Sequence, residues 1–258
     1  MILSLPAEAV LAHALIGMRV VAVVFTAPLL SHRAIPRRVR LAMSFALTLG
    51  VASSGTGVPT PLAEPAAVEL ASMLLQEALI GAAIGVAAGF AFAGFGMMAE
   101  FIAIQGGLGA ANAIDPTSGI STVVLTSLIQ VIGLLVFMAI DGHHQVLLVL
   151  MNSFNTLPVG ASWSTLSGIF EGVVALGAVI FRVAVSLAAP VVVAMLASNV
   201  AVGILGRTIP QLNLIALQLP AHIALTLLLL GLGAGPLTEQ MSGYLSGVVT
   251  DIGVLVAE

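Results

Sequence analysis

The sequence contains neither cysteine nor lysine, and it has little charge of either sign. Without cysteine there is no disulfide, no thiolate nucleophile and no cysteine-ligated metal. All seven basic residues are arginine, which excludes a P-loop lysine and a Schiff-base lysine. Charged residues make up 7% of the chain, against about 25% in a soluble domain, and the mean hydropathy is +1.20. Such a chain cannot cover its surface in water, so the composition indicates an integral membrane protein.

Apolar segments rich in Ala, Leu, Val and Gly account for most of the chain. They are Val10–Leu30, Leu41–Ala52, Val68–Phe95, Val123–Ile140, Ile169–Ser198 and Leu212–Ala234, followed by a short tail over 235–258. Only helices or closed barrels satisfy the backbone in lipid, and the alternating pattern of barrel strands is missing. We therefore predict an all-α, polytopic integral membrane protein with long Gly/Ala-rich helices and helical hairpins, in one membrane domain over 1–258. Leu41–Ala52 is too short to cross about 30 Å of hydrocarbon, so its helix is predicted to begin at Pro36.

Four arginines cluster between the first two segments, in "SHRAIPRRVR": Arg33, Arg37, Arg38 and Arg40. By the positive-inside rule this basic loop lies on the cytoplasmic side, with the N-terminus outside. Because "MILSLPAEAV" lacks a positively charged start, the first segment is expected to be retained and not cleaved as a signal peptide. The arginines open a helix, where the dipole disfavours cations, so they serve either the topology or an anionic partner.

Small residues recur every four positions in the third segment, at Gly81, Gly85 and Gly89. Glycine at this spacing lets two helix backbones approach closely. The stripe therefore predicts a helix-packing seam. The partner is either a helix of the same chain or a helix of another subunit, and the sequence leaves both open.

Charged side chains inside apolar segments are costly and mark either a functional path or a buried pair. They are Arg19, Glu77 and Arg182, with Glu100 and Glu171 near segment ends. In a transporter they would form a relay for a coupling ion. Their scatter over four segments favours the alternative, in which they pair with one another or with backbone carbonyls between helices.

The stretch "DGHH" places Asp141, His143 and His144 close together in sequence. Adjacent histidines are expected to diverge on a helix, and no HExxH spacing is present, so we predict a polar cap and turn and no metal site. Ser153 could complete a Ser-His-Asp set with His143 and Asp141. No G-x-S-x-G element supports that set, and no catalytic residue is predicted.

The loop "GGLGAANAIDPTSG" over 106–119 joins two long apolar segments and is almost uncharged. It is either a solvent loop or a re-entrant element, since irregular backbone survives at membrane depth only inside protein or beside a wet cavity. Small uncharged side chains suit a constriction that must yield to a passing substrate.

Five stretches, in order along the chain, resemble one family. They are "RVVAVVFTAPLLSHRAIPRRVRLAMSFAL", "QEALIGAAIGVAAGFAF", "AEFIAIQGGLGAANAIDP", "DGHHQVLLVLMNSFNTLPVG" and "NVAVGILGRTIPQLN". Together they carry the family's Ala-Pro, Gly-His, Ser/Thr-Phe, Leu-Pro-x-Gly and Gly-x-x-x-Arg-x-x-Pro-Gln patterns. The chain therefore resembles the FliR proteins of the flagellar type III export gate. The positions that carry this signature are Arg19, Pro28, Gly142, His143, Arg207, Pro210 and Gln211.

The resemblance implies a structural channel subunit without cofactor, which helps to form and plug the conduit for unfolded flagellar subunits. Its implied partners are FliP-like and FliQ-like gate subunits and an FlhB-like switch protein, in a helical assembly in the bacterial inner membrane at the flagellar basal body. It also implies a FliP-like part over 1–160 and a FliQ-like hairpin part over 161–258. The implied channel plug consists of Gly106, Gly107, Leu108, Gly109, Ala110, Ala111, Asn112, Ala113, Ile114, Asp115 and Pro116.

Three alternatives remain at this point. A secondary transporter of a small solute would show internal repeats and matching broken helices, and neither is seen in the sequence. The chain also resembles, less closely, the equivalent subunit of virulence-type secretion systems. An intramembrane hydrolase would depend on Ser153 and His143.

Overall fold

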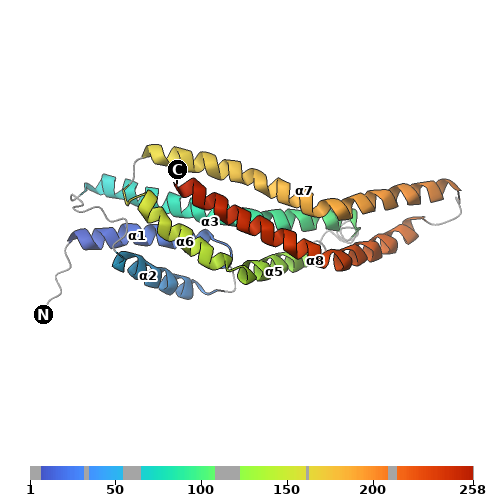
Figure 1. Ribbon diagram of the computed structural model, residues 1–258, viewed down its shortest axis with the longest axis horizontal. Helices are drawn as coiled ribbons and strands as arrows, with labels where there is room; N and C mark the ends of the chain where they lie inside the picture. Colours follow the sequence, from blue (N-terminus) through green and yellow to red (C-terminus); the bar gives the residue numbers. More distant parts are fainter. Residues whose placement is uncertain are drawn as a thin grey trace. The chain divides into compact units, whose positions relative to one another are not determined.

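The computed structural model describes residues 7–31, 35–54, 65–107, 123–160, 163–208 and 214–257 (Figure 1). Every regular element in these ranges is a helix, which confirms the predicted all-α class. The helices are α1 (Ala7–Thr26), α2 (Arg37–Ser53), α3 (Ala67–Gln105), α5 (Val123–Ala139), α6 (Gly142–Thr156), α7 (Trp163–Thr208) and α8 (Leu214–Ala257).

The helices differ from the predicted segments in three places. Helix α2 begins at Arg37, because Pro36 has the extended ψ of 142° and lies just before the helix. Residues 142–156, which follow the fourth apolar segment, form a separate helix, α6. The predicted tail is the second half of α8, which continues through Pro236 to Ala257. Membrane helices tolerate such prolines because neighbouring groups satisfy the freed carbonyls.

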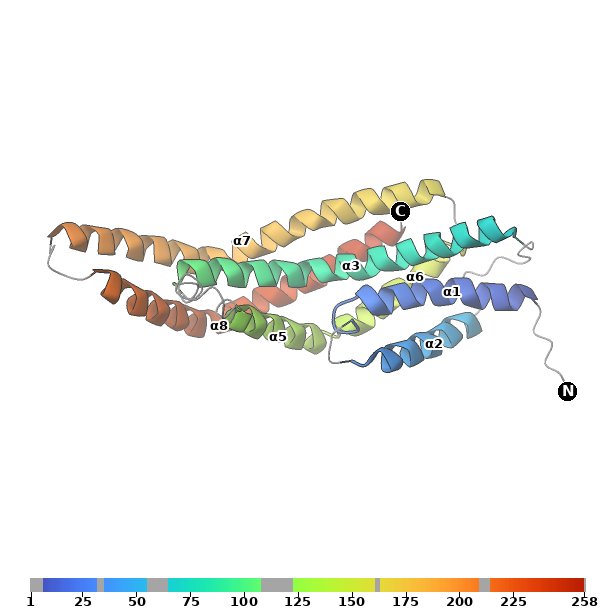
Figure 2. The same cartoon turned by 180° about the vertical axis from the view of Figure 1, so that it is seen from behind.

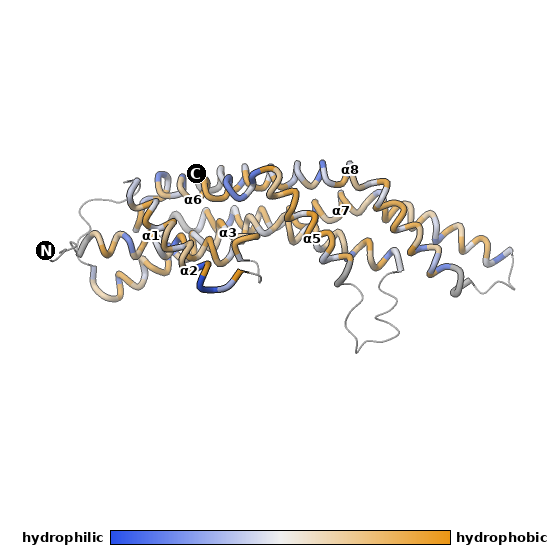
Figure 3. Tube along the Cα trace, turned by 90° about the horizontal axis from the view of Figure 1, so that it is seen from below, coloured by the Kyte–Doolittle hydropathy of each residue, from blue (hydrophilic) through white to orange (hydrophobic). Residues whose placement is uncertain are grey.

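Hydrophobic side chains follow most of the helical length (Figure 3). Among the described residues, four stretches are long and apolar enough to cross a membrane: Ala9–Thr26, Ala67–Gln105, Ser167–Thr208 and Gln218–Val254. The broken pair α5 and α6 adds a fifth if it counts as one span. The second predicted segment is not among them, because α2 has 17 residues. By length and composition, the described residues therefore provide four or five spans, fewer than the six apolar segments of the sequence.

The chain divides into two compact units. Unit 1 comprises Met1–Phe90, Asp141–Gly177 and Ser246–Glu258. Unit 2 comprises Ala91–Ile140 and Ala178–Leu245. Since α3, α7 and α8 each contribute to both units, the units do not follow the order of the sequence.

Unit 1 has a core of small and branched side chains from α1 and α3, including the fully buried Leu15, Val23 and Ala87. Helix α2 runs beside α1, and Gly17 of α1 faces Thr48 of α2 (Figures 1 and 2). Helix α6 adds the fully buried Phe154. These helices position the polar groups described below.

Unit 2 contains a hairpin of α7 and α8, whose parts in this unit run side by side (Figures 1 and 2). The Gln218 side-chain amide donates to Asn199 Oδ1 at 3.1 Å, and Thr226 Oγ1 lies 3.8 Å from Met195 Sδ. The end of α3 and α5 supply an aromatic cluster, in which the Phe92 ring meets Phe95 and Phe137 edge-on at 5.9 and 5.4 Å.

Candidate functional site: the Arg19 centre

Arg19 lies in the middle of α1 in unit 1 and has no exposed surface. Its Nε donates to Glu77 Oε2 of α3 at 2.6 Å. Its Nη1 donates to the Ser153 carbonyl at 2.9 Å and to Ser153 Oγ at 3.1 Å. Its Nη2 donates to the Leu157 carbonyl at 3.0 Å. A single guanidinium thus binds α1 to α3, to α6 and to the turn that follows α6.

Glu77 is also fully buried and uses its second carboxylate oxygen on the same turn. The backbone N–H of Gly160 donates to Glu77 Oε1 at 3.1 Å. Gly160 has φ +82°, a conformation that favours glycine, and a Cβ there would lie 2.8 Å from Met73 Cε. The turn therefore requires glycine at this position in order to present its N–H to the carboxylate.

Phe154 and Ser153 complete the surroundings of the guanidinium. The Arg19 Cζ lies 4.3 Å from the centroid of the Phe154 ring, which gives a cation–π contact. Ser153 Oγ donates to the Leu150 carbonyl at 2.6 Å while it accepts from Arg19. We call Arg19, Glu77, Ser153, Phe154, Leu157 and Gly160 the Arg19 centre.

Buried charges cost free energy unless they are paired and hydrogen-bonded, and here both conditions hold. The two charges neutralise each other, and the polar atoms named above have partners. This arrangement fastens helices together and leaves no free acid, base or nucleophile. For Arg19 and Glu77, this arrangement agrees with the alternative from the sequence in which charges inside apolar segments pair between helices.

The glycines that follow Glu77 allow α1 and α3 to lie in backbone contact. A Cβ at Gly81 would collide with the Arg19 carbonyl oxygen and would lie 2.8 Å from Ala22 Cβ. A Cβ at Gly85 would collide with Thr26 Oγ1 and would lie 2.8 Å from the Ala27 amide nitrogen. The structure thus places these two glycines against a helix of the same chain.

Gly89, the third glycine of the stripe, has no atom of another element within 4 Å of a Cβ built on it. Four residues advance a helix by about 400°, so a period of four drifts by about 40° per step, and Gly89 has turned away from α1. Further along α3, Gly94 approaches α7 within unit 2, where a Cβ would lie 2.9 Å from Val183 Cβ.

Of the proposed plug, only Gly106 and Gly107 lie within the described residues, and Leu108–Pro116 lie outside them. Gly106 N–H donates to the Ile102 carbonyl at 2.8 Å, and Gly107 follows with φ +74°, a common way for glycine to end a helix. A Cβ at Gly106 would collide with Thr226 of α8. The loop therefore starts from a point packed tightly on α8 in unit 2.

The basic cluster opens α2. Arg37 and Arg38 are exposed, and Arg40 is half-buried with its Cζ 5.7 Å from the Phe25 ring centroid. Arg33 lies outside the described residues. Pro28 lies in the turn that closes α1, where Leu29 has φ +68°, an uncommon value for leucine.

The remaining signature residues that the structure describes lie at helix ends. Gly142 and His143 start α6, and Asp141 stands at the N-cap position with a left-handed φ of 55° and without a side-chain capping hydrogen bond. The expectation that the two histidines diverge is wrong, since their ring centroids are 4.1 Å apart. Arg207 is exposed in the last turn of α7, where the helix dipole favours a cation. Pro210 and Gln211 lie outside the described residues.

The structure does not form the Ser-His-Asp set. Ser153 is ten positions beyond His143 on the same helix, which corresponds to about 15 Å along the axis. Its hydroxyl is buried and already bonded in the Arg19 centre. Of the other intramembrane charges, Arg182 and Glu171 are exposed and Glu100 is half-buried.

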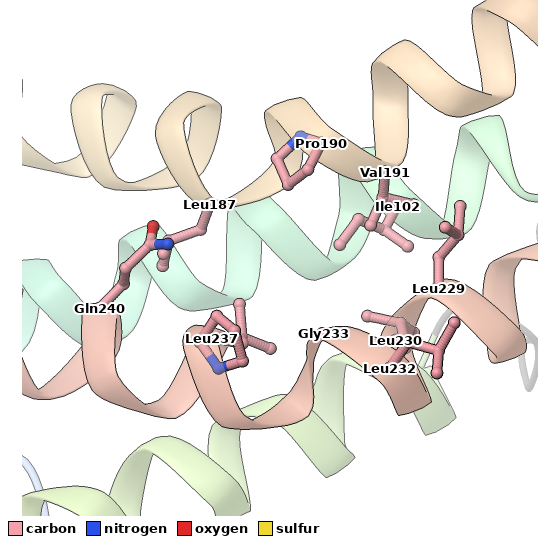
Figure 4. Close-up of a pocket in the computed structure, with 11 residues that line it drawn as sticks. Ile102, Leu187, Pro190, Val191, Leu229, Leu230, Leu232, Gly233, Leu237 and Gln240 are labelled. Atoms are coloured by element: carbon pink, nitrogen blue, oxygen red, sulfur yellow. The ribbon is translucent and has the colours of Figure 1, made fainter.

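An apolar cavity of about 410 Å³ lies in unit 2 between α3, α7 and α8 (Figure 4). It is lined by Ile102, Leu187, Pro190, Val191, Leu229, Leu230, Leu232, Gly233, Pro236, Leu237 and Gln240. Gln240 is its one side chain with hydrogen-bonding groups. Such a lining accepts an apolar group and offers no chemistry for catalysis.

Sequence reasoning identified Arg19, Glu77 and the Leu-Pro-x-Gly stretch separately but did not bring them together. The helix that sequence reasoning did not predict was α6, which connects these residues. Its buried positions Val146, Val149, Leu150 and Phe154 have helical spacing, and this signal was available in the sequence.

The comparisons with known proteins agree with this geometry. The model of the family "Bacterial export proteins, family 1" matches residues 10–248. The flagellar biosynthetic protein FliR of Escherichia coli (strain K12) is 33% identical over 239 residues, covering 91% of this chain and 90% of the relative. FliR of Pectobacterium carotovorum subsp. carotovorum is 33% identical over 234 residues, covering 91% and 88%. FliR of Bacillus subtilis (strain 168) is 30% identical over 225 residues, covering 85% and 84%. This chain, whose Arg19 centre joins three of the stretches that resemble FliR, belongs to the FliR family of bacterial export proteins.

Proposed function

We infer that this chain is a structural subunit of the flagellar type III export gate and a multi-pass protein of the bacterial inner membrane. The observation that carries this inference is the convergence on Arg19 of the Ser-Phe and Leu-Pro-x-Gly stretches, within a chain matched by the export family over residues 10–248. The relatives named above are flagellar proteins, which favours the flagellar system over a virulence system.

We propose that the chain acts without catalysis. The best-formed polar site, the Arg19 centre, is closed by its own ion pair and hydrogen bonds. The apolar cavity of unit 2 supplies no nucleophile. A conduit subunit needs stable helix packing and a passage, and neither requires covalent bonds to be made or broken.

We propose FliP-like and FliQ-like gate subunits and an FlhB-like switch protein as the partners. Support comes from α8, because only 11% of its most apolar stretch is buried inside the chain, against 56% for α3. Surface of this kind is covered by lipid or by other proteins. A photo-crosslinking amino acid at Leu228, which is 57% exposed, is expected to capture a gate subunit in intact cells. Exclusive crosslinking to lipid would contradict this assignment.

The channel plug is proposed to extend from Gly106 to Pro116. Gly106 and Gly107 anchor the start of this stretch on α8, so that a loop of small residues can be held at one end. The amino acids that follow carry one charge, Asp115, and so present few groups that would bind a passing chain.

Deletion of the gene for this chain tests the function directly. Export of flagellar hook and filament subunits should stop, swimming should be lost, and expression of the wild-type chain should restore both. The small-solute transporter would instead give a growth or uptake defect in cells that still assemble flagella, and that result would overturn the proposed function.

A further inference from the structure

The start of α6 gathers three metal-ligating side chains that the proposed function does not use. Asp141, His143 and His144 each offer one ligand atom, and these atoms lie within 4.8 Å of one another. Asp141 Oδ1 and His144 Nδ1 are 3.5 Å apart. Asp141 and His144 are not covered by the rest of the chain, with 70% and 66% of their side-chain surface accessible.

Two observations show that this cluster is incompletely satisfied by the protein's own hydrogen bonds. The Nδ1 atom of His143 is buried and has no hydrogen-bond partner. Asp141 occupies the N-cap of α6, yet its carboxylate makes no capping hydrogen bond. An N-cap aspartate normally accepts from a backbone N–H of the first turn. Here the Asp141 carboxylate is paired with His144 instead, and the His143 Nδ1 atom has no partner.

The backbone holds the three residues in one tight turn. Asp141 has the left-handed φ of 55°, and its carbonyl accepts from the N–H groups of His144 at 2.9 Å and Gln145 at 3.2 Å. The two imidazole rings lie side by side with their centroids 4.1 Å apart. The side chains are therefore presented on one side of the turn by a backbone that is already fixed.

Although the sequence predicted no metal site in this stretch, we propose that Asp141, His143 and His144 bind a divalent transition-metal ion of the zinc type. Two imidazoles and a carboxylate are ligands that Zn²⁺ accepts at about 2.0–2.2 Å, so that in a tetrahedral site the ligand atoms lie about 3.3–3.6 Å from one another. The exposed side chains reach this separation by small rotations. The carboxylate also offsets the positive end of the α6 dipole, which would otherwise oppose a cation.

The ion would clamp the N-cap of α6 to its first turn and give the unpartnered imidazole nitrogen a ligand bond. Three protein ligands leave one tetrahedral position for water, so the expected role is stabilisation of the first turn of α6. This proposal stands on the local geometry and does not depend on the export function.

The test uses the full-length chain in detergent, purified through a tag without histidine and stripped with EDTA. Titration with Zn²⁺ in a calorimeter is expected to show one site per chain with a micromolar or lower Kd. His144→Ala and Asp141→Asn should each weaken binding by at least about tenfold. His13→Ala, which changes a histidine on α1 outside the cluster, is the matched control and should bind as the wild type does.

Two further measurements make the result decisive. Electron paramagnetic resonance with Cu²⁺ as the probe should show two imidazole nitrogens in the wild type and one in His144→Ala. Zn²⁺ should raise the melting temperature of the wild type but not of His144→Ala. Millimolar or weaker binding, equal affinity in His144→Ala and wild type, or loss of binding in His13→Ala would each overturn the proposal.

Discussion

At the scale of single residues, Arg19 shows how a buried charge can hold membrane helices together. Its three nitrogen atoms serve four acceptors on α3, α6 and the following turn. Removal of one partner from such a pair leaves an uncompensated buried charge, which costs about 3–5 kcal/mol. The pair therefore makes unit 1 intolerant of single changes at either position.

The glycines beside this pair give the first prediction. Gly85→Ala should destabilise the protein, because the new methyl group would collide with Thr26 Oγ1 and press on the Ala27 amide. Gly89→Ala is the matched control, since a Cβ there meets nothing and alanine favours the helix by about 1 kcal/mol. The melting temperature of the purified chain should fall for Gly85→Ala and stay equal or rise for Gly89→Ala. Equal behaviour of the two variants would show that α1 does not pack at Gly85.

At the scale of elements, the sequence predicted most long helices because their apolar runs exceed a membrane thickness. It failed for α6 and for the second half of α8, where hydropathy alone is a poor guide. In α6, polar residues such as His143, His144 and Asn152 lower the average, although its buried face has helical spacing. In α8, the predicted apolar segment ends at Ala234, yet Met241, Leu245 and Ile252 are buried beyond that point.

The candidate site was less accessible to sequence reasoning than the helices. Arg19 and Glu77 are 58 residues apart in the sequence. The hydrogen-bond acceptors of Arg19 on α6 and the following turn are more than 130 residues away. No periodicity connects segments at such separations. The need for glycine at Gly81 and Gly85 could be predicted locally, because it follows from the spacing of small residues on one helix.

The second prediction concerns the orientation of α2. Its first turn carries the exposed Arg37 and Arg38 and no acidic residue, so the positive-inside rule places this end on the cytoplasmic side. The chain has no native cysteine, so Arg37→Cys introduces a unique label site. A membrane-impermeant thiol reagent should label it in inverted vesicles and not in intact spheroplasts. Labelling from the periplasmic side alone would show that α2 has the opposite orientation.

At the scale of the whole molecule, much of the apolar surface is left for other components of the membrane. Leu232, Val174 and Phe181 are 75%, 77% and 62% exposed, and α8 buries little of its apolar stretch inside the chain. Burial of apolar area from water contributes about 25 cal/mol per Å². A subunit with this surface is expected to depend on its assembly and on lipid for stability.

The third prediction concerns passage through the assembled gate. Deletion of residues 108–113 removes small side chains of the proposed plug and keeps Gly107, which ends α3. Inner membranes with the variant gate should become permeable to ions and small solutes, while the gate still assembles. Permeability can be measured by conductance in planar bilayers. An intact variant gate with wild-type conductance would show that this stretch is an ordinary loop and not a plug.

The claim that the Arg19–Glu77 ion pair holds unit 1 together is tested most directly by measuring the coupling free energy between these two residues. Arg19→Met, Glu77→Met and the double variant should be compared by unfolding of the purified chain in mixed micelles and by swimming of the cells. Each single variant is expected to lose about 3–5 kcal/mol and to abolish motility, because one charge remains buried without its partner. The double variant should be more stable than the sum of the single losses predicts, with a coupling of about 2 kcal/mol. Strictly additive losses, or a motile Arg19→Met strain with normal stability, would contradict the claim that this ion pair holds the fold together.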